Sequence, residues 1–276
     1  MKSKIIKFHD TFHFQVDDTV LDSLAFKSFR PTTKNVQDFY KAGVRLFHVY
    51  VSGLPSGLKA PYSLFGETWF GDHKYDWTNL DKQIEFFKEN APEGYLFINI
   101  HLDVRDWWLK ENPGNPNSFT HLSQIACNDK WKQDTADYLK ALIKHTEEKY
   151  NDRIIGYFLL GGYTTEWFSQ FDNEEENPYK LEAYRKYMND DNITIPGKDK
   201  LEQPKEEILL RGNKEEVINY RKFHNKVVSD LVLYLCHEAQ TILNHNKILG
   251  LFFGYILELV NDRMWYAGHI EFDDIN

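Results

Sequence analysis

Residues 154–168 read IIGYFLLGGYTTEWF. The run from Ile154 to Leu160 is almost wholly apolar, as a strand buried on both faces of a parallel sheet should be. Polar and aromatic residues follow, and they place Glu166 just past the end of this strand. A buried strand that runs straight into a polar loop is typical of α/β proteins, so this stretch predicts the fold class.

Four more apolar runs lie on either side of this strand. They predict strands at residues 20–27 (VLDSLAFK), 44–52 (VRLFHVYVS), 95–103 (YLFINIHLD) and 249–257 (LGLFFGYIL). Helical patterns lie between the runs: they begin near Asn35, at Thr78, after a cap at Asn128, at Pro178 and near Lys214. This alternation predicts βαβ units around a parallel sheet.

A polar stretch at residues 189–213 contains Pro196, Gly197 and Pro204. It can be a domain linker or an excursion on the rim of a barrel. The helices on either side of it belong to a single strand-to-strand connection, which favours the excursion.

The loops after the second, third and fourth predicted strands are long and rich in charged and aromatic residues, whereas the connections that lead into strands are short. This asymmetry is expected of a (β/α)8 TIM barrel, whose active site is built at the C-terminal ends of its strands. A doubly wound sheet also places its site there, but neither G-x-G-x-x-G nor G-x-x-x-x-G-K-[ST] follows any strand. We therefore expect a barrel, and the sequence gives nucleotide binding no support.

The strand count bears on the completeness of this barrel. A TIM barrel takes about 250 residues, and the chain has 276, but its long loops leave room for about the first five β/α units. We expect residues 1–276 to form one TIM-barrel domain that is incomplete and lacks the last strands. An open barrel exposes strand edges, so the chain alone is expected to be poorly soluble or inactive.

Composition points to a neutral ligand. Aromatic residues make up 16% of the chain, and many fall in loops, where flat faces suit sugar rings. The net charge of −9 argues against nucleic-acid and membrane partners. Cys127 and Cys236 are far apart and form no CxxC motif, and no signal peptide or long apolar segment is present. We expect a cytoplasmic protein with a carbohydrate substrate, no cofactor and no metal. A homo-oligomer is left open.

Glu166 is the strongest candidate for chemistry. Trp167 and Phe168 flank it and would partly desolvate its carboxyl group, which favours the protonated form and suits it to protonate a leaving group. Glycoside hydrolysis needs such an acid. The alternative is that Glu166 caps a helix or pairs with an arginine.

The end of the third predicted strand and the loop after it offer further candidates. His101 and Asp103 are two residues apart and so point to the same side of the strand, where they are a plausible pair of ligands for sugar hydroxyls. A structural role for His101 remains open. Asp103 and Arg105 can equally form a salt bridge that holds the loop.

Tryptophans in the loops after the second and third predicted strands can stack on a sugar face. Of Trp69, Trp107 and Trp108, we expect one to stack and the others to pack. Glu67 can bind substrate or order its own loop. Glu258 ends the fifth predicted strand, where a ligand carboxylate would fit, although a buried partner for Arg263 is favoured.

Two other enzyme classes are excluded by missing motifs. His237-Glu238 lacks the second histidine of HExxH, so the chain is not a zincin. No serine lies in a G-x-S-x-G motif, which removes the usual esterase.

These residues together resemble clan A glycoside hydrolases, and most closely the β-galactosidases of glycoside hydrolase family 42. The matching pieces include Tyr75-Asp76-Trp77 before a helix, Arg105-Asp106-Trp107-Trp108-Leu109 after the third strand, and Ile155-Gly156-Tyr157 entering the strand that leads to Glu166. The resemblance covers about residues 20–259. Each motif by itself is only moderately specific for the family. Their shared order and spacing are stronger evidence, because they are harder to obtain by chance.

The resemblance implies a retaining, β-galactosidase-like glycosidase with Glu166 as general acid/base. Together with the positions of the residues themselves, it leads us to expect substrate contacts from a set of loop and strand-end residues: His101, Asp103, Arg105, Trp107, Thr165, Trp167 and Glu258. In that family an asparagine that binds the sugar 2-hydroxyl precedes the acid/base, and Thr165 stands in its place here. A retaining enzyme also needs a nucleophilic carboxylate, which we expect beyond Asn276.

Two alternatives remain open. The chain can be a non-catalytic carbohydrate-binding barrel, in which Thr165 marks the loss of activity. It can also be an enzyme completed within this chain by Glu258, which is less favoured because Glu258 would lie on the fifth strand.

Overall fold

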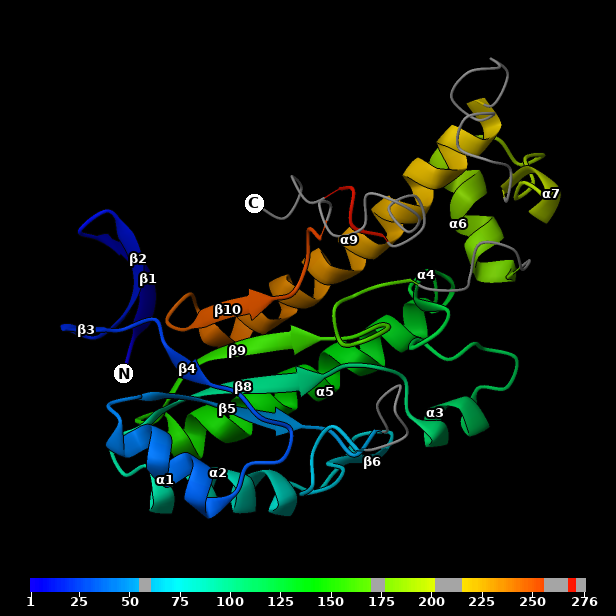
Figure 1. Ribbon diagram of the computed structural model, residues 1–276. Helices are drawn as coiled ribbons and strands as arrows, with labels where there is room; N and C mark the ends of the chain where they lie inside the picture. Colours follow the sequence, from blue (N-terminus) through cyan, green and yellow to red (C-terminus); the bar gives the residue numbers. More distant parts are fainter. Residues whose placement is uncertain (55–60, 170–176, 202–214, 256–267, 272–276) are drawn as a thin grey trace. The chain divides into compact units, whose positions relative to one another are not determined.

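The computed structural model describes residues 1–54, 61–169, 177–201, 215–255 and 268–271 (Figure 1). The chain divides into two compact units. Unit 1 comprises residues 1–108, 134–160 and 235–251. Unit 2 comprises residues 109–133, 161–234 and 252–276.

A parallel sheet forms the centre of unit 1. Within the described residues its strand order is β10-β9-β8-β5-β4, so each strand lies beside its predecessor in this sheet along the sequence. The strands are β4 (Ala25–Phe26), β5 (Leu46–Val51), β8 (Tyr95–His101), β9 (Ile154–Leu160) and β10 (Ile248–Leu251). The prediction of βαβ units is confirmed, and the limits predicted for the strand at 154–160 agree with β9.

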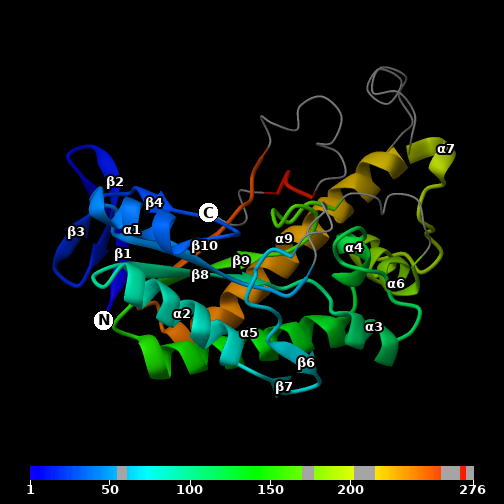
Figure 2. The ribbon, with the colours of Figure 1, turned by 60° about the horizontal axis from the view of Figure 1, so that its bottom comes forward.

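Helices line one face of this sheet (Figures 1 and 2). They include α1 (Thr33–Lys41), α2 (Thr78–Asn90) and α5 (Asp129–Tyr150), which begin close to where the sequence predicts. On this face Phe47 of β5 packs against Phe87 of α2, with ring centroids 5.9 Å apart. This contact is part of the hydrophobic core of unit 1.

The opposite face of the sheet is buried too, and it carries polar side chains among apolar ones such as Leu46 and Phe97. Side chains alternate along a strand, so His48 points away from α2. Asn99 of β8 donates its amide to His48 Nδ1 at 2.9 Å. Burial lowers the pKa of His48 to about 4, so it is neutral at pH 7. The buried polar residues His48, Asn99 and His101 lie on β5 and β8, whose C-terminal ends carry the candidate site.

The N-terminal residues form a small antiparallel sheet that the sequence analysis missed. It contains β1 (Ser3–Phe8), β2 (Thr11–Val16) and β3 (Thr19–Leu21), in that order. The predicted strand at residues 20–27 is therefore wrong as a single element. Its start pairs with β2, and only β4 joins the parallel sheet. The turn-favouring pair Asp22-Ser23 separates the two parts.

The fifth predicted strand, residues 249–257, is too long. β10 ends at Leu251, and residues 252–255 are not in a strand. Gly254 has a φ of 82°, which takes the chain out of the extended conformation. Residues 256 and 257 lie outside the described part of the chain.

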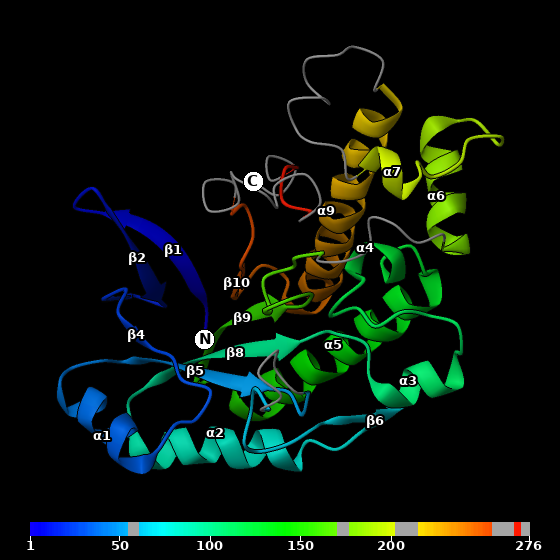
Figure 3. The ribbon, with the colours of Figure 1, turned by 45° about the vertical axis from the view of Figure 1, so that its right-hand side comes forward.

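Unit 2 is mainly helical in its described part. Helices α4 (Leu122–Ile125), α6 (Pro178–Met188) and the unit 2 part of α9 (Glu215–Leu243) lie close together (Figure 3). Tyr184, Tyr220 and Phe223 form the centre of its core. The predicted start of α6 at Pro178 is confirmed, and Asn177 caps the helix by accepting from the Lys180 N–H at 3.1 Å.

Three short elements complete the described fold. They are the hairpin of β6 (Trp69–Gly71) and β7 (Lys74–Tyr75), helix α3 (Asp106–Glu111) and helix α7 (Lys198–Leu201). Helix α7 lies within the predicted excursion at residues 189–213, of which residues 202–213 are outside the described chain. Among the described residues, no helix has the length and apolar character needed to span a bilayer.

Candidate active site

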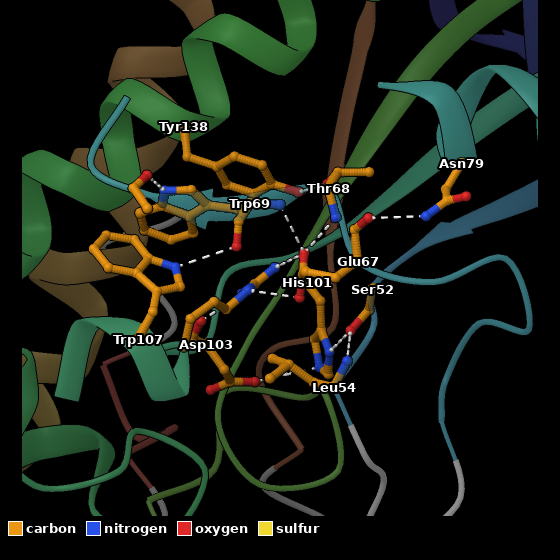
Figure 4. A network of polar contacts seen from close by, with 12 residues as sticks. Ser52, Leu54, Glu67, Thr68, Trp69, Asn79, His101, Asp103, Trp107 and Tyr138 are labelled. Atoms are coloured by element: carbon orange, nitrogen blue, oxygen red, sulfur yellow. Dashed lines mark hydrogen bonds and ion pairs between the residues drawn. The ribbon is translucent and has the colours of Figure 1, made fainter. Parts of the chain in front are cut away.

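The C-terminal ends of β5 and β8 bring three polar side chains together in unit 1 (Figure 4). His101 Nδ1 lies 3.0 Å from Ser52 Oγ, and His101 Nε2 lies 3.2 Å from Asp103 Oδ2. His101 and Asp103 are each only 2% exposed. The prediction that these two side chains share one side of the strand is confirmed.

The protonation of His101 follows from its surroundings. Burial, with the nearby Arg105 charge, lowers its pKa to about 3, so the ring is neutral at pH 7 and its contact with Asp103 is not an ion pair. Ser52 Oγ accepts the Leu54 N–H at 3.0 Å, so its own hydrogen is available for His101 Nδ1. We therefore assign the ring proton to Nε2, facing the Asp103 carboxylate.

A buried ion pair lies beside this group. Arg105 Nε donates to Glu67 Oε2 at 3.1 Å, and Glu67 Oε1 accepts the backbone N–H groups of Thr68 at 2.8 Å and Trp69 at 3.1 Å. Burial alone would raise the pKa of Glu67, but Arg105 and these N–H groups outweigh it, and the net pKa is lowered. Burial alone would lower the pKa of Arg105. The negative charge of Glu67 outweighs this effect and keeps the pKa of Arg105 above its usual value.

These contacts settle two alternatives from the sequence. Arg105 forms its ion pair with Glu67, and its contact with Asp103 is a hydrogen bond from Nη1 to the backbone oxygen. The proposed side-chain salt bridge between Asp103 and Arg105 is therefore wrong. Glu67 orders its own loop, as one of its two predicted roles required.

Aromatic rings surround Arg105. Its guanidinium lies 5.3 Å from the Trp69 ring centroid and 5.4 Å from that of Tyr138, and these two rings stack at 4.7 Å. Trp69 and Trp108 are fully buried. Trp107 is partly exposed, and its Nε1 donates to the backbone oxygen of Trp69 at 3.2 Å. Of these three tryptophans, Trp107 alone is partly exposed, and its stacking on a sugar stays a prediction.

Gly53 allows Glu67 to approach the end of β5. A Cβ atom added at Gly53 would lie 2.6 Å from Glu67 Cβ and 2.7 Å from Glu67 N. Real Cβ atoms do not come so close to the backbone. The position of Glu67 therefore depends on a glycine that follows Ser52.

Glu166 lies in unit 2, on a loop that begins directly after β9. Two backbone hydrogen bonds close this loop: Trp167 N donates to Gly161 O at 2.7 Å, and Tyr163 N donates to Phe168 O at 2.9 Å. The Trp167 ring packs on Gly161, where an added Cβ would lie 2.7 Å from it. Trp167 is only 1% exposed, so its predicted contact with substrate stays a prediction.

The backbone of this loop is strained. Gly162, Thr164, Thr165 and Trp167 have φ values of 69°, 60°, 75° and 59°. Such values are rare for residues other than glycine, and rarest for β-branched ones such as threonine. Strained residues cluster at functional sites. Here they form the loop on which Glu166 is partly exposed.

The Glu166 carboxylate has one partner in its own loop. The Thr164 hydroxyl donates to Glu166 Oε2 at 2.7 Å. Thr165, the residue in the place of the expected asparagine, is 6% exposed. The predicted cap or arginine pair for Glu166 is not seen among the described residues.

The structure thus brings together His101, Asp103, Arg105 and Trp107 in unit 1, and Thr165, Glu166 and Trp167 in unit 2. Glu258 and Arg263 lie outside the described residues. The sequence did not indicate that Ser52 and Tyr138 contact the candidate site, because neither residue belongs to a recognisable motif. It also left open the pairing of Glu67 with Arg105, because 38 positions separate them.

Comparisons with known proteins support the fold. No family model and no curated protein matches the sequence. Among solved structures, the catalytic domain of a β-amylase from Paenibacillus polymyxa matches with a TM-score of 0.58 and 12% identity, over 87% of this chain and 68% of that domain. A β-galactosidase from the psychrophilic Marinomonas ef1 matches with a TM-score of 0.51 and 10% identity, over 83% of this chain and 36% of the galactosidase.

At such low identities the likeness establishes the fold alone. The chain is an α/β protein with a parallel sheet, and its structural neighbours are TIM-barrel glycosidases. The chain spans little more than a third of the galactosidase.

Proposed function

We propose that this protein is a retaining glycoside hydrolase that acts on a β-linked sugar and resembles a β-galactosidase, with Glu166 as its general acid/base. The observation that carries the proposal is a glutamate that follows a buried strand directly, on a loop with a strained backbone. The fold that it shares with a β-amylase and a β-galactosidase supports the same class of chemistry.

The proposed reaction has two steps. Glu166 protonates the glycosidic oxygen as the bond to the anomeric carbon breaks and a nucleophilic carboxylate binds that carbon. After the leaving group has departed, Glu166 accepts a proton from the water that releases the sugar. The Thr164 hydroxyl bonds one oxygen of Glu166, which orients the carboxylate.

Within unit 1 taken by itself, two side chains are proposed as sugar ligands. The Asp103 carboxylate accepts hydrogen bonds from hydroxyl groups, and its neighbour His101 stays neutral because it is buried. Trp107 offers a partly exposed ring for stacking. Arg105 acts mainly through its ion pair with Glu67, which fixes the loop.

Hydrolysis of an aryl β-galactoside tests the proposal. The Glu166→Gln variant should lose at least about 100-fold in kcat, since an amide cannot donate the proton. The control is Glu148→Gln, which changes an exposed carboxylate on α5 and should leave kcat unchanged. Equal activity of Glu166→Gln and wild type would disprove the role of Glu166.

A second function, non-catalytic sugar binding, is favoured by one observation. Thr165 occupies the place of the expected asparagine, and its side chain is almost fully buried. This alternative predicts that the wild-type protein binds a β-galactoside without hydrolysing it, and that Glu166→Gln binds it equally well. Calorimetric titration measures the binding.

A further inference from the structure

The short segment 268–271 lies against the loop of Glu166 within unit 2. Its His269 side chain is 1% exposed. The imidazole stacks on the Phe168 ring, with centroids 4.5 Å apart and planes 29° apart, and on the Phe253 ring, at 4.4 Å and 26°. Phe168 is the residue whose carbonyl closes the loop by accepting from Tyr163. His269 therefore packs directly on the closing residue of the loop.

Helix α9 fixes the backbone on both sides of His269. The Ile270 N–H donates to the side-chain oxygen of Asn225 at 3.2 Å. Gly268 has a φ of 92°, and an added Cβ there would lie 2.7 Å from Val228. Asn225 and Val228 are both buried residues of α9. The place of the imidazole is thus set by a helix and not by the loop that it contacts.

The ring nitrogens of His269 show which form of the imidazole is present. The Tyr255 N–H donates to His269 Nδ1 at 3.3 Å, so the proton of the neutral ring is on Nε2. Burial lowers the pKa of His269 to about 4, against the opposing effect of the backbone of Glu166 and Trp167. At pH 7 the ring is therefore neutral, and the backbone that carries Glu166 lies next to it.

The loop needs a contact of this kind. A left-handed backbone is unfavourable for residues other than glycine, and the loop has three such residues, at Thr164, Thr165 and Trp167. Such strain persists only where the surroundings hold it. The direction of the Glu166 carboxylate depends on this backbone, because its side chain starts between two of the strained residues.

We propose that His269 is a positioning residue for Glu166. It stacks on Phe168 and lies against the backbone of Glu166 and Trp167, and it thereby keeps the strained loop in the one conformation that presents the carboxylate. The catalytic consequence rests on the proposed function of Glu166, whereas the effect on the loop does not.

Two variants separate the parts of this contact. His269→Phe keeps a ring between Phe168 and Phe253 and removes both nitrogens. His269→Gln keeps an N–H donor near the place of Nε2 and removes the ring. The control Val217→Ala shortens a buried side chain in the core of unit 2, away from the loop, and so lowers stability without touching Glu166.

Hydrogen exchange of the loop amides tests the effect on the loop. The amides of Tyr163 and Trp167 are protected by the two closing hydrogen bonds. We expect both His269 variants to increase their exchange by roughly 10-fold or more relative to wild type. Val217→Ala and Glu166→Gln should leave exchange at these two positions near the wild-type rate. Unchanged protection in His269→Phe and in His269→Gln would overturn the proposal, and if one variant does not fold, the other decides.

Kinetics test the consequence for catalysis. Misplacement of the acid should lower kcat by roughly 10- to 100-fold, with KM for the aryl glycoside within about twofold of wild type. Wild-type kcat in both His269 variants, while Glu166→Gln is inactive, would overturn the positioning role alone. Full activity of Glu166→Gln would instead disprove the proposed function, and the exchange measurement would still decide whether His269 holds the loop.

Discussion

Glu67 in unit 1 and Glu166 in unit 2 are both loop carboxylates that follow strands of the parallel sheet, but they are held in different ways. Glu67 is fixed by charge: it binds Arg105 and two backbone N–H groups in a buried setting. Glu166 accepts one hydroxyl, and its loop is held by backbone hydrogen bonds, left-handed residues and ring packing. A carboxylate neutralised by an arginine is a poor proton donor, whereas one in a strained, partly exposed loop can exchange protons with a substrate.

The comparison predicts that the ion pair contributes most to stability. Arg105→Met leaves the Glu67 carboxylate without its counter-charge in a site where Glu67 is 19% exposed. The free energy of unfolding should fall by about 3–5 kcal/mol. Urea unfolding followed by circular dichroism measures it. The control Lys144→Met breaks an exposed pair with Glu148 and should change stability by less than about 0.5 kcal/mol. If both variants lose less than about 0.5 kcal/mol in the free energy of unfolding, the buried ion pair does not contribute most to stability.

The difference between the regions is only partly visible in the sequence. The uninterrupted apolar run of β9 predicts its strand well, because strand burial is a local signal. The N-terminal sheet was missed because Lys2, Lys4 and Lys7 interrupt its apolar pattern. Its strands are stabilised by pairing with one another and by packing of Phe14 on Phe97, which is a distant contact.

The candidate site shows the same limit. Glu166, His101 and Asp103 could be singled out because each lies at the end of a predicted strand or just past it. The pairing of Glu67 with Arg105 could not be derived, since it depends on how a long loop folds back over β5 at Gly53. The strain at Thr165 is also invisible in the sequence, because threonine does not favour a positive φ.

Acid should weaken the protein through its buried histidines. His48 has a pKa of 6.5 when unfolded and about 4 when folded. Above pH 6.5 it is neutral in both states, and between pH 6.5 and 4 only the unfolded state binds the proton. The free energy of unfolding should therefore fall with falling pH in this window, by about 1.4 kcal/mol per pH unit from this residue.

The variant His48→Asn isolates this effect. Between pH 6 and 5, its free energy of unfolding should change less steeply with pH than that of wild type. The difference in slope should correspond to the uptake of about one proton on unfolding. Chemical denaturation at several pH values provides the comparison. Parallel curves for the two proteins would mean that His48 is already protonated or exposed in the folded state.

Crowding at Gly53 should disturb the charged region and not the strained one. In Gly53→Ala the new methyl group meets the backbone of Glu67, which must move. We expect a loss of about 1–3 kcal/mol in the free energy of unfolding. Hydrogen exchange should show weaker protection at Thr68 and Trp69, whose N–H groups bind Glu67, and no change at Trp167. Normal protection of Thr68 and Trp69 would contradict the close approach.

The smallest expected effect concerns strain at Thr165. Asparagine adopts a left-handed backbone more readily than threonine. Thr165→Asn should therefore raise the free energy of unfolding by up to about 1 kcal/mol. In the proposed glycosidase it should also increase kcat, since it restores the residue that the resemblance leads us to expect. The control Thr241→Asn changes a helical threonine of α9 and should be neutral in denaturant titrations. A clear loss of stability in Thr165→Asn alone would contradict the strained conformation.

The most direct test of the account uses Glu166→Ala with a 2,4-dinitrophenyl β-galactoside and azide. This leaving group departs without protonation, so the first step needs no acid, while release of the sugar lacks its base. Azide needs no base and should restore turnover, and nuclear magnetic resonance should show a β-galactosyl azide with retained configuration. Absence of azide rescue, or release of free sugar at the wild-type rate, would contradict the assignment of Glu166 as the acid/base of a retaining glycosidase.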